Sequence, residues 1–206
     1  MGMLSLDSVN QLSQIRFQSL PPIDSSWTLF LDRDGTINKR LEGDYVRKPD
    51  QFEWLPGVLE ALAGLSQLFG RIIVVTNQQG IGKGLMTESD LAEVHGYMLT
   101  HVEHAGGRID AIYHCPALAE SGDPCRKPAT GMAMQAKKDF PEIDFERSVM
   151  VGDGQTDMEF GAKLGMYTLH IQDHSYPEID GVLANLQVSG LLEFWHLCQP
   201  ILKQSK

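Results

Sequence analysis

The stretch that most restricts how this chain can fold is a short apolar run that ends in two carboxylates. Residues 27–31 read W-T-L-F-L, and Asp32, Arg33, Asp34 and Gly35 follow directly. A continuous apolar run of this length is typical of a strand that helices cover on both faces. In open α/β sheets, ligands bind beyond the carboxyl ends of such strands. We therefore expect Asp32 and Asp34 to lie at a binding edge.

Further apolar runs of strand length alternate with helical patterns along the chain. We predict strands over 72–75, 109–114, 149–151 and 166–171, and helices over 56–69, 88–102, 132–139, 157–164 and 190–201. Strands that alternate with amphipathic helices indicate a parallel sheet with helices on both faces. The insertions after the strands are short. We therefore predict an α/β fold, a three-layer doubly wound parallel sheet without a separate cap domain.

Length and local composition suggest one folded domain and a short extension. The 206 residues are enough for one well-packed α/β domain and short for two. Residues 1–26 are polar, weakly patterned and closed by two prolines. We expect an N-terminal extension there, with a short helix over 6–17. The folded domain would comprise residues 27–206.

Charge and cysteine content argue against several classes of protein. The net charge of −10 opposes nucleic-acid binding, because clustered lysines and arginines bind phosphate backbones, but it allows a small phosphorylated metabolite. No apolar run is long enough to span a bilayer, and the N-terminus lacks a signal-peptide pattern. Three cysteines are too few and odd in number for a disulfide framework. We expect a cytoplasmic protein that does not bind membranes.

Polar residues at three predicted strand ends form a candidate site. They are Asp32 and Asp34, Thr76 and Asn77, and Asp153, with Lys127 in a later C-R-K-P segment. Because the carboxyl ends of parallel strands share one edge, these distant residues become neighbours. Carboxylates, a hydroxyl group and a lysine suit phosphoryl transfer through an aspartyl phosphate. Taken alone, the two acids also fit a solvated turn after a strand.

The residue types also suggest how such a site would act. Mg²⁺ held by Asp32 and Asp153 would reverse the repulsion between a carboxylate and a phosphate dianion. Thr76 and Lys127 can donate hydrogen bonds to the phosphoryl oxygens in the transition state. Asp34 is placed to protonate the leaving oxygen and later to deprotonate the attacking water.

Four motifs together resemble those of a known family. They read F-L-D-R-D-G-T-I-N, V-V-T-N-Q-Q-G-I-G-K-G, C-R-K-P and V-G-D-G-Q-T-D, in this order between residues 27 and 171. They look like the motifs of the haloacid dehalogenase-like phosphatases, which have a Rossmann-like fold. The resemblance is strongest to the subgroup of D-glycero-D-manno-heptose 1,7-bisphosphate phosphatases and histidinol phosphatases. It implies an Mg²⁺-dependent phosphomonoesterase.

The resemblance implies a role for each matching residue. Asp32 would be the nucleophile, and Asp34 the general acid and base. Thr76 would bind the transferring phosphoryl group, and Lys127 would stabilise it. Asp32, the main-chain carbonyl of Asp34 and Asp153 would hold Mg²⁺.

Outside this set, Asp157 would orient the lysine or the metal ligands, and Asn77 and Arg126 match positions that touch substrate. The chain departs from the subgroup just before Arg-Lys-Pro. The subgroup usually carries Cys-x-His and then Cys-x-Cys, whereas here Pro-Ala follows Cys115 and Asp-Pro precedes Cys125. Structural zinc takes four nitrogen or sulfur donors, so we expect no zinc and a loop held by packing.

Several functions remain open at this point. Heptose 1,7-bisphosphate is the best-matching substrate, and histidinol phosphate is the alternative. A polynucleotide 3′-phosphatase is a third reading, because R-K-P-A-T-G-M echoes that group, although the acidic net charge opposes it. A signalling receiver domain also combines a phosphoacceptor aspartate, Mg²⁺, threonine and lysine, but its phosphoacceptor follows a later strand. A monomer with an open site is our default.

Other polar residues are interpreted as unrelated to the chemistry. Gly80 to Gly84 fail the spacing of a nucleotide P-loop and predict a turn at the rim of the pocket. Lys83 is expected to be an ordinary solvated charge. Histidines of one amphipathic helix are expected on its solvated surface: His95, His101 and His104. The direction of the Arg33 side chain stays open.

Overall fold

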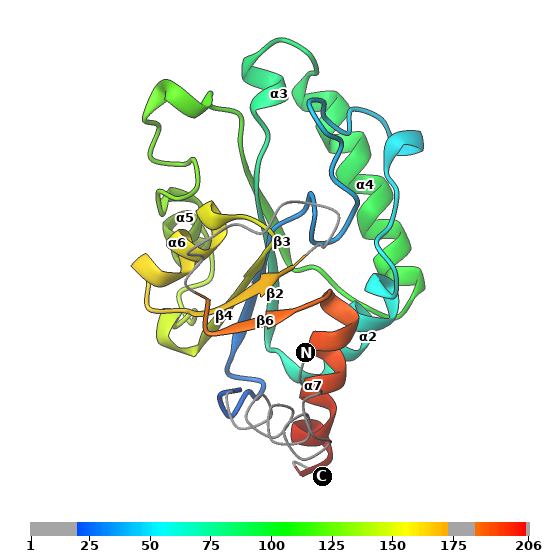
Figure 1. The fold of residues 1–206 in the computed structure, drawn as a ribbon, viewed down its shortest axis with the longest axis vertical. Helices are drawn as coiled ribbons and strands as arrows, with labels where there is room; N and C mark the ends of the chain where they lie inside the picture. The colour runs from blue at the N-terminus through cyan, green and yellow to red at the C-terminus, as the bar shows by residue number, and fades with distance from the viewer. Residues whose placement is uncertain (1–19, 173–183, 205–206) are drawn as a thin grey trace, which may run out of the picture.

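The computed structural model of the chain describes residues 20–172 and 184–204. At its centre lies a parallel sheet of six strands in the order β3-β2-β1-β4-β5-β6 (Figure 1). The strands are β1 (Thr28–Leu31), β2 (Arg71–Asn77), β3 (Ala111–Cys115), β4 (Ser148–Gly152), β5 (Tyr167–Ile171) and β6 (Leu186–Val188).

Helices cover both faces of this sheet. One face carries α2 (Val58–Leu68), α4 (Glu88–His104) and α7 (Leu191–Gln204), and the other carries α5 (Gly131–Asp139) and α6 (Gln155–Lys163) (Figure 1). The shorter helices are α3 (Gln79–Gly82), η1 (Pro49–Gln51), η2 (Ala119–Ser121) and η3 (Phe145–Arg147). The predicted three-layer α/β fold is confirmed, and the described residues contain no separate cap domain.

Strand β1 shows why its sequence is apolar throughout. Leu29 and Leu31 pack into the core under α2, α4 and α7, whereas Phe30 packs into the core under α5 and α6. All three side chains are fully buried. Burial of each contributes roughly 1.5–3 kcal/mol to folding. Because β2 and β4 pair with β1 on its two sides, the residue after β1 is fixed at the middle of the sheet.

Three elements differ from the sequence prediction. Strand β6 was missed, because only Leu186 and Val188 face the core and a run of three residues gives little signal. Strand β2 continues through Thr76 and Asn77, which were expected beyond its end. The glycine-rich segment forms the short helix α3 rather than only a turn.

One residue of the predicted N-terminal extension packs against the folded domain. Ile23 is 1% exposed and belongs to the core under α2, α4 and α7. The helix expected over 6–17 lies outside the described residues. Among the residues that the structure describes, no helix is long and apolar enough to cross a membrane.

Two of the three cysteines are joined, which the sequence prediction did not foresee. Cys115, at the end of β3, forms a disulfide with Cys125, and Asp123 accepts a hydrogen bond from the Cys125 amide at 2.8 Å. An odd cysteine count argues against a framework of disulfides but not against a single bond. The expectation that packing alone holds this loop was therefore wrong. Cys198 is free and buried.

Candidate active site

The carboxyl edge of the central strands forms a cavity of about 440 Å³. The amide of Asp32 donates to the carbonyl of Val151 at 2.9 Å, so the chain stays in the sheet for one residue beyond β1. The predicted site residues that line the cavity are Asp32, Asp34, Thr76, Asn77, Arg126 and Lys127. Asp153, which follows β4, is connected to this cavity through Arg40. Arg40 lines the cavity, and its Nη2 atom lies 2.6 Å from Asp153 Oδ1. The structure thus brings together residues from four distant segments.

Lys127 is buried at the base of this cavity. Its Nζ atom donates to Asp32 Oδ1 at 2.8 Å and to the carbonyl of Val75 at 2.7 Å, and it pairs with Asp157 Oδ1 at 2.6 Å. Burial works to lower the pKa of Lys127, but the two carboxylates outweigh it and raise the pKa. The ammonium group therefore stays charged and fixes one oxygen of Asp32.

Three carboxylates crowd around this lysine. Asp32, Asp153 and Asp157 each offer an oxygen, and these oxygens lie within 4.8 Å of one another. Burial, and then the charge of Asp157, raise the pKa of Asp32 to about 6, although Lys127 opposes the shift. Burial and the charge of Asp32 raise the pKa of Asp153 to about 8. A cluster of this kind calls for a further cation, and its oxygen donors suit Mg²⁺.

A cation can approach two of the predicted metal ligands at once. Arg40 Nη2 lies 2.6 Å from Asp153 Oδ1 and 3.5 Å from the carbonyl oxygen of Asp34. Gly35, with a φ of +92°, permits this arrangement. A Cβ atom on Gly35 would lie 1.8 Å from Asp153 Oδ2. Gly35, the glycine of the first motif, therefore leaves the space that the Asp153 carboxylate occupies.

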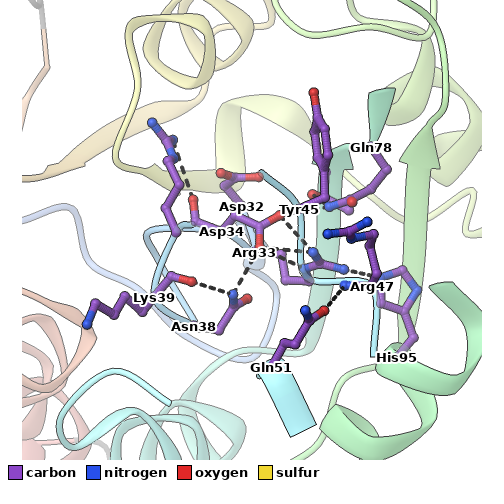
Figure 2. Close-up of polar contacts among 12 residues, drawn as sticks. Asp32, Arg33, Asp34, Asn38, Lys39, Tyr45, Arg47, Gln51, Gln78 and His95 are labelled. Atoms are coloured by element: carbon purple, nitrogen blue, oxygen red, sulfur yellow. Dashed lines mark hydrogen bonds and ion pairs between the residues drawn. The ribbon is translucent and has the colours of Figure 1, made fainter. Parts of the chain in front are cut away.

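Asp34 is held by three side chains (Figure 2). Its Oδ1 accepts from Arg33 Nη2 and Asn38 Nδ2, both at 2.9 Å, and its Oδ2 accepts from Arg33 Nη2 and Gln78 Nε2, both at 2.8 Å. Burial acts to raise the pKa of Asp34, but the charge of Arg33 and these hydrogen bonds outweigh it, so the pKa lies below its usual value. Gln78 Nε2 also donates to Thr76 Oγ1 at 2.9 Å.

The two predicted substrate contacts have partners within the protein. Asn77 exchanges hydrogen bonds with the backbone of Lys127, at 3.0 Å to its amide and 3.1 Å from its carbonyl. It thereby fixes the segment that carries the lysine. Arg126 donates to the carbonyl of Ala117 at 3.0 Å while it lines the cavity. Lys83 is exposed, as expected, but it also lines the cavity, and its ammonium group donates to the hydroxyl of Tyr45 at 3.0 Å.

Sequence reasoning missed several residues of this site. Gln78 directly follows the predicted Thr-Asn pair, so its place at the strand end was a usable signal. The expectation that His95 is solvated was wrong: it is 9% exposed and contacts Arg33. It adjoins Leu91, Val94 and Met98 on the buried side of α4, which the helical period could have indicated. Arg40 lies in a polar loop without any such pattern.

Comparison with known proteins assigns the family. Residues 28–185 match the family model described as polynucleotide kinase 3 phosphatase. The chain belongs to this family of haloacid dehalogenase-like phosphatases. Two relatives of this phosphatase are named D-glycero-alpha-D-manno-heptose-1,7-bisphosphate 7-phosphatase. The Mycobacterium tuberculosis protein is 37% identical over 164 residues, which cover 80% of each chain. The Campylobacter jejuni protein is 38% identical over 167 residues, covering 81% of this chain and 94% of the relative.

A solved structure agrees with the assignment of this phosphatase. The D,D-heptose 1,7-bisphosphate phosphatase of Bordetella bronchiseptica, complexed with magnesium and phosphate, superposes with a TM-score of 0.74. It is 27% identical, and the match covers 87% of this chain and 99% of that one. The superposition on a phosphatase and the position of Asp32 and Asp34 directly after β1 therefore exclude the alternative of a receiver domain.

Proposed function

We propose that this phosphatase removes the 7-phosphate of a D-glycero-D-manno-heptose 1,7-bisphosphate through a phosphorylated Asp32. The observation that carries the proposal is the placement of the Asp32 carboxylate in one cavity with Lys127, Thr76 and the Asp34 carboxylate. The names of the relatives supply the substrate. Histidinol phosphate remains the alternative within the same chemistry.

Asp32 is the proposed nucleophile. One of its oxygens, Oδ1, is bound to Lys127, which leaves Oδ2 as the atom to attack phosphorus. The P–O bond to the sugar breaks as the P–O bond to Asp32 forms. Thr76 and Lys127 then donate to the phosphoryl oxygens, whose negative charge grows in the transition state.

Asp34 is the proposed general acid and base. Because its pKa is lowered, Asp34 is ionised in the free enzyme. In the second half of the reaction it can therefore take a proton from the water that hydrolyses the aspartyl phosphate. In the first half it has to give a proton to the departing sugar oxygen. A phosphate dianion bound beside Thr76 brings negative charge next to Asp34 and thereby favours its protonated form.

Mg²⁺ is the proposed cofactor, held by Asp32, Asp153 and the carbonyl of Asp34. The support is the cluster of buried carboxylates with raised pKa values and the magnesium bound in the Bordetella bronchiseptica structure. When bound, the ion supplies positive charge that offsets the carboxylates and the phosphate. Asp157 pairs with Lys127 and would keep the ammonium group in place. For zinc, we keep the expectation that the loop does not bind it.

A second phosphate on the substrate would meet cations on the cavity wall. Arg40, Lys83 and Arg126 all line the cavity around the Asp32 carboxylate. Relatives named for the alpha and for the beta heptose bisphosphate both match the chain, so both anomers belong in the assay. We also propose a monomeric, cytoplasmic enzyme that acts on a small metabolite.

The test is a panel of phosphorylated substrates ranked by kcat/KM with Mg²⁺ present. The panel contains both heptose 1,7-bisphosphate anomers, histidinol phosphate and a 3′-phosphorylated oligonucleotide. We expect one heptose bisphosphate to lead by at least tenfold, and the oligonucleotide, disfavoured by the net charge of −10, to be poorest. A leading oligonucleotide would overturn the proposal in favour of the activity for which the family model is named.

Asp32→Asn tests the chemistry independently of the substrate. The change keeps the shape of the side chain but removes the nucleophile, so we expect turnover to fall by roughly four orders of magnitude or more. A circular dichroism spectrum and a thermal melt would show that the fold is retained. Substantial remaining activity would remove Asp32 from its role.

A further inference from the structure

We propose that Arg33 and His95 form a clamp that positions the Asp34 carboxylate for proton transfer to the leaving group. The proposal rests on the proposed function of Asp34 as general acid and base. Neither residue touches the cavity, so both would act through Asp34 as positioning residues.

Arg33 is buried completely, although it lies between two residues of the site. Alternation along β1 and the residues after it places Arg33 on the same side as Leu29 and Leu31, which is the side that α4 covers. Its exposed fraction is 0%. A buried guanidinium group costs free energy unless hydrogen bonds and a counter-charge compensate. The compensation here comes from the Asp34 carboxylate.

The guanidinium group binds both oxygens of that carboxylate. Arg33 Nη2 lies 2.9 Å from Oδ1 and 2.8 Å from Oδ2 of Asp34, and Nε lies 3.3 Å from Oδ1. A planar fork that grips both oxygens fixes the rotation of a carboxylate as well as its place. Arg33, together with Asn38 and Gln78, therefore fixes the direction in which Asp34 presents its oxygens to the cavity.

His95 fixes the other side of the guanidinium group. Figure 2 shows Arg33 extending between Asp34 and the imidazole of His95, whose Nε2 lies 3.2 Å from Arg33 Nη1. Arginine can only donate hydrogen bonds, so His95 Nε2 accepts and the ring is neutral. Burial, together with the positive charge of Arg33, lowers the pKa of His95 to about 3, which keeps this acceptor available.

Helix α4 gives the clamp a rigid base. Thr87 and Asp90 form a capping box at its first turn, and the helix runs for 17 residues. The His95 ring also packs against the ring of His114, with 6.2 Å between the ring centroids. His114 Nε2 in turn lies 2.8 Å from Glu88 Oε2 in the first turn of the helix. A catalytic group must be held to within a fraction of an ångström for efficient proton transfer. The clamp connects Asp34 to a helix that takes no other part in the site.

The experiment compares two leaving groups. A sugar oxygen needs a proton as it departs, whereas p-nitrophenolate does not. For both substrates kcat/KM covers the steps up to departure of the leaving group, so the ratio of sugar phosphate to p-nitrophenyl phosphate reports proton donation by Asp34. The sugar phosphate is the one with the highest kcat/KM in the panel above.

Two substitutions of His95 separate the hydrogen bond from packing. His95→Leu removes the acceptor, and we expect the ratio to fall at least tenfold with little change in KM. His95→Gln keeps an acceptor and should recover most of it. His104→Leu, on an exposed position of the same helix, is the control and should leave the ratio unchanged.

The outcomes are distinct from those of the proposed function. A variant that is merely less stable loses activity on both substrates equally, so its ratio stays at the wild-type value. A ratio within twofold of wild type in His95→Leu, or an equal fall in His95→Gln, overturns the clamp. A panel in which no heptose bisphosphate leads would overturn the substrate assignment and leave the ratio test valid with whichever sugar phosphate is best.

Discussion

Replacing Gly35 by alanine should inactivate the enzyme by displacing one carboxylate. The new Cβ atom would lie 1.8 Å from Asp153 Oδ2 and 2.3 Å from its Cγ, whereas ordinary contact begins at 3.4 Å. The carboxylate oxygen therefore has to move by 3.4 − 1.8 = 1.6 Å. Such a shift takes the Asp153 carboxylate away from its place beside Asp32 and Asp157, where we propose that Mg²⁺ binds.

Two effects of this substitution can be estimated. A misplacement of about 1 Å at a catalytic group costs on the order of 100-fold in rate, so we expect kcat to fall at least that far and the Mg²⁺ requirement to rise. The φ of +92° at Gly35 is strained for alanine, at roughly 1–3 kcal/mol of folding stability. Only the first effect depends on Asp153.

Gly106→Ala separates the two effects. Gly106 has a φ of +82°, and a Cβ there would meet nothing within 4 Å. It should lose a similar amount of stability in urea unfolding and keep its activity. The assay is p-nitrophenyl phosphate turnover as a function of Mg²⁺ concentration, below the unfolding transition of both variants. If Gly35→Ala stays within threefold of Gly106→Ala, Asp153 does not act where the structure places it.

Three further predictions concern the buried charges and thiols. Lys127→Met leaves the carboxylates of Asp32 and Asp157 buried without a counter-charge. We therefore expect no turnover, and a free energy of unfolding in urea that is about 3–5 kcal/mol lower. A loss below about 1 kcal/mol would contradict the ion pairs of Lys127 with these carboxylates. The pKa values of Asp32 (about 6) and Asp153 (about 8) are raised, so the folded chain holds protons more tightly than the unfolded one. With EDTA present, the free energy of unfolding should therefore fall as the pH rises from 5 to 8, and saturating Mg²⁺ should make this fall smaller. A free energy of unfolding that does not change over this pH range would count against the carboxylate cluster. Burial raises the pKa of the Cys198 thiol to about 12, so a thiol reagent should label no cysteine in the native protein. It should label one cysteine after unfolding, and three after unfolding with reductant, because Cys115 and Cys125 are joined. Labelling of three cysteines without reductant would exclude the disulfide.

Most of the fold was predictable because its signals are local. Strands β1, β2 and β4 are buried on both faces, so each had to be a continuous apolar run. The capping residue Thr87 marks the start of α4 in the sequence as it does in the structure. Strand β6 could not be predicted, because its three residues gain their stability from pairing with β5. Pairing is a tertiary contact and leaves no period in the sequence.

The site was predictable where a residue stands at the end of a strand. Asp32 and Thr76 could be placed near one another from the topology of a parallel sheet alone. Arg40 could not, because it reaches Asp153 from a loop and is 113 residues away in sequence. His95 is an intermediate case. Its position on the buried side of α4 was readable, but only the alternation of β1 explains that Arg33 faces it.

The loop between β3 and α5 shows what a count of donors leaves out. The sequence indicates that half of a four-ligand zinc loop is missing, and from that count we expected a loop held only by packing. The structure instead joins the two remaining cysteines, Cys115 at the end of β3 and Cys125, in a disulfide with their Cα atoms 5.6 Å apart. Only one residue separates Cys125 from Lys127. The disulfide therefore anchors to the sheet the segment whose lysine pairs with Asp32, as a metal ion in that loop would.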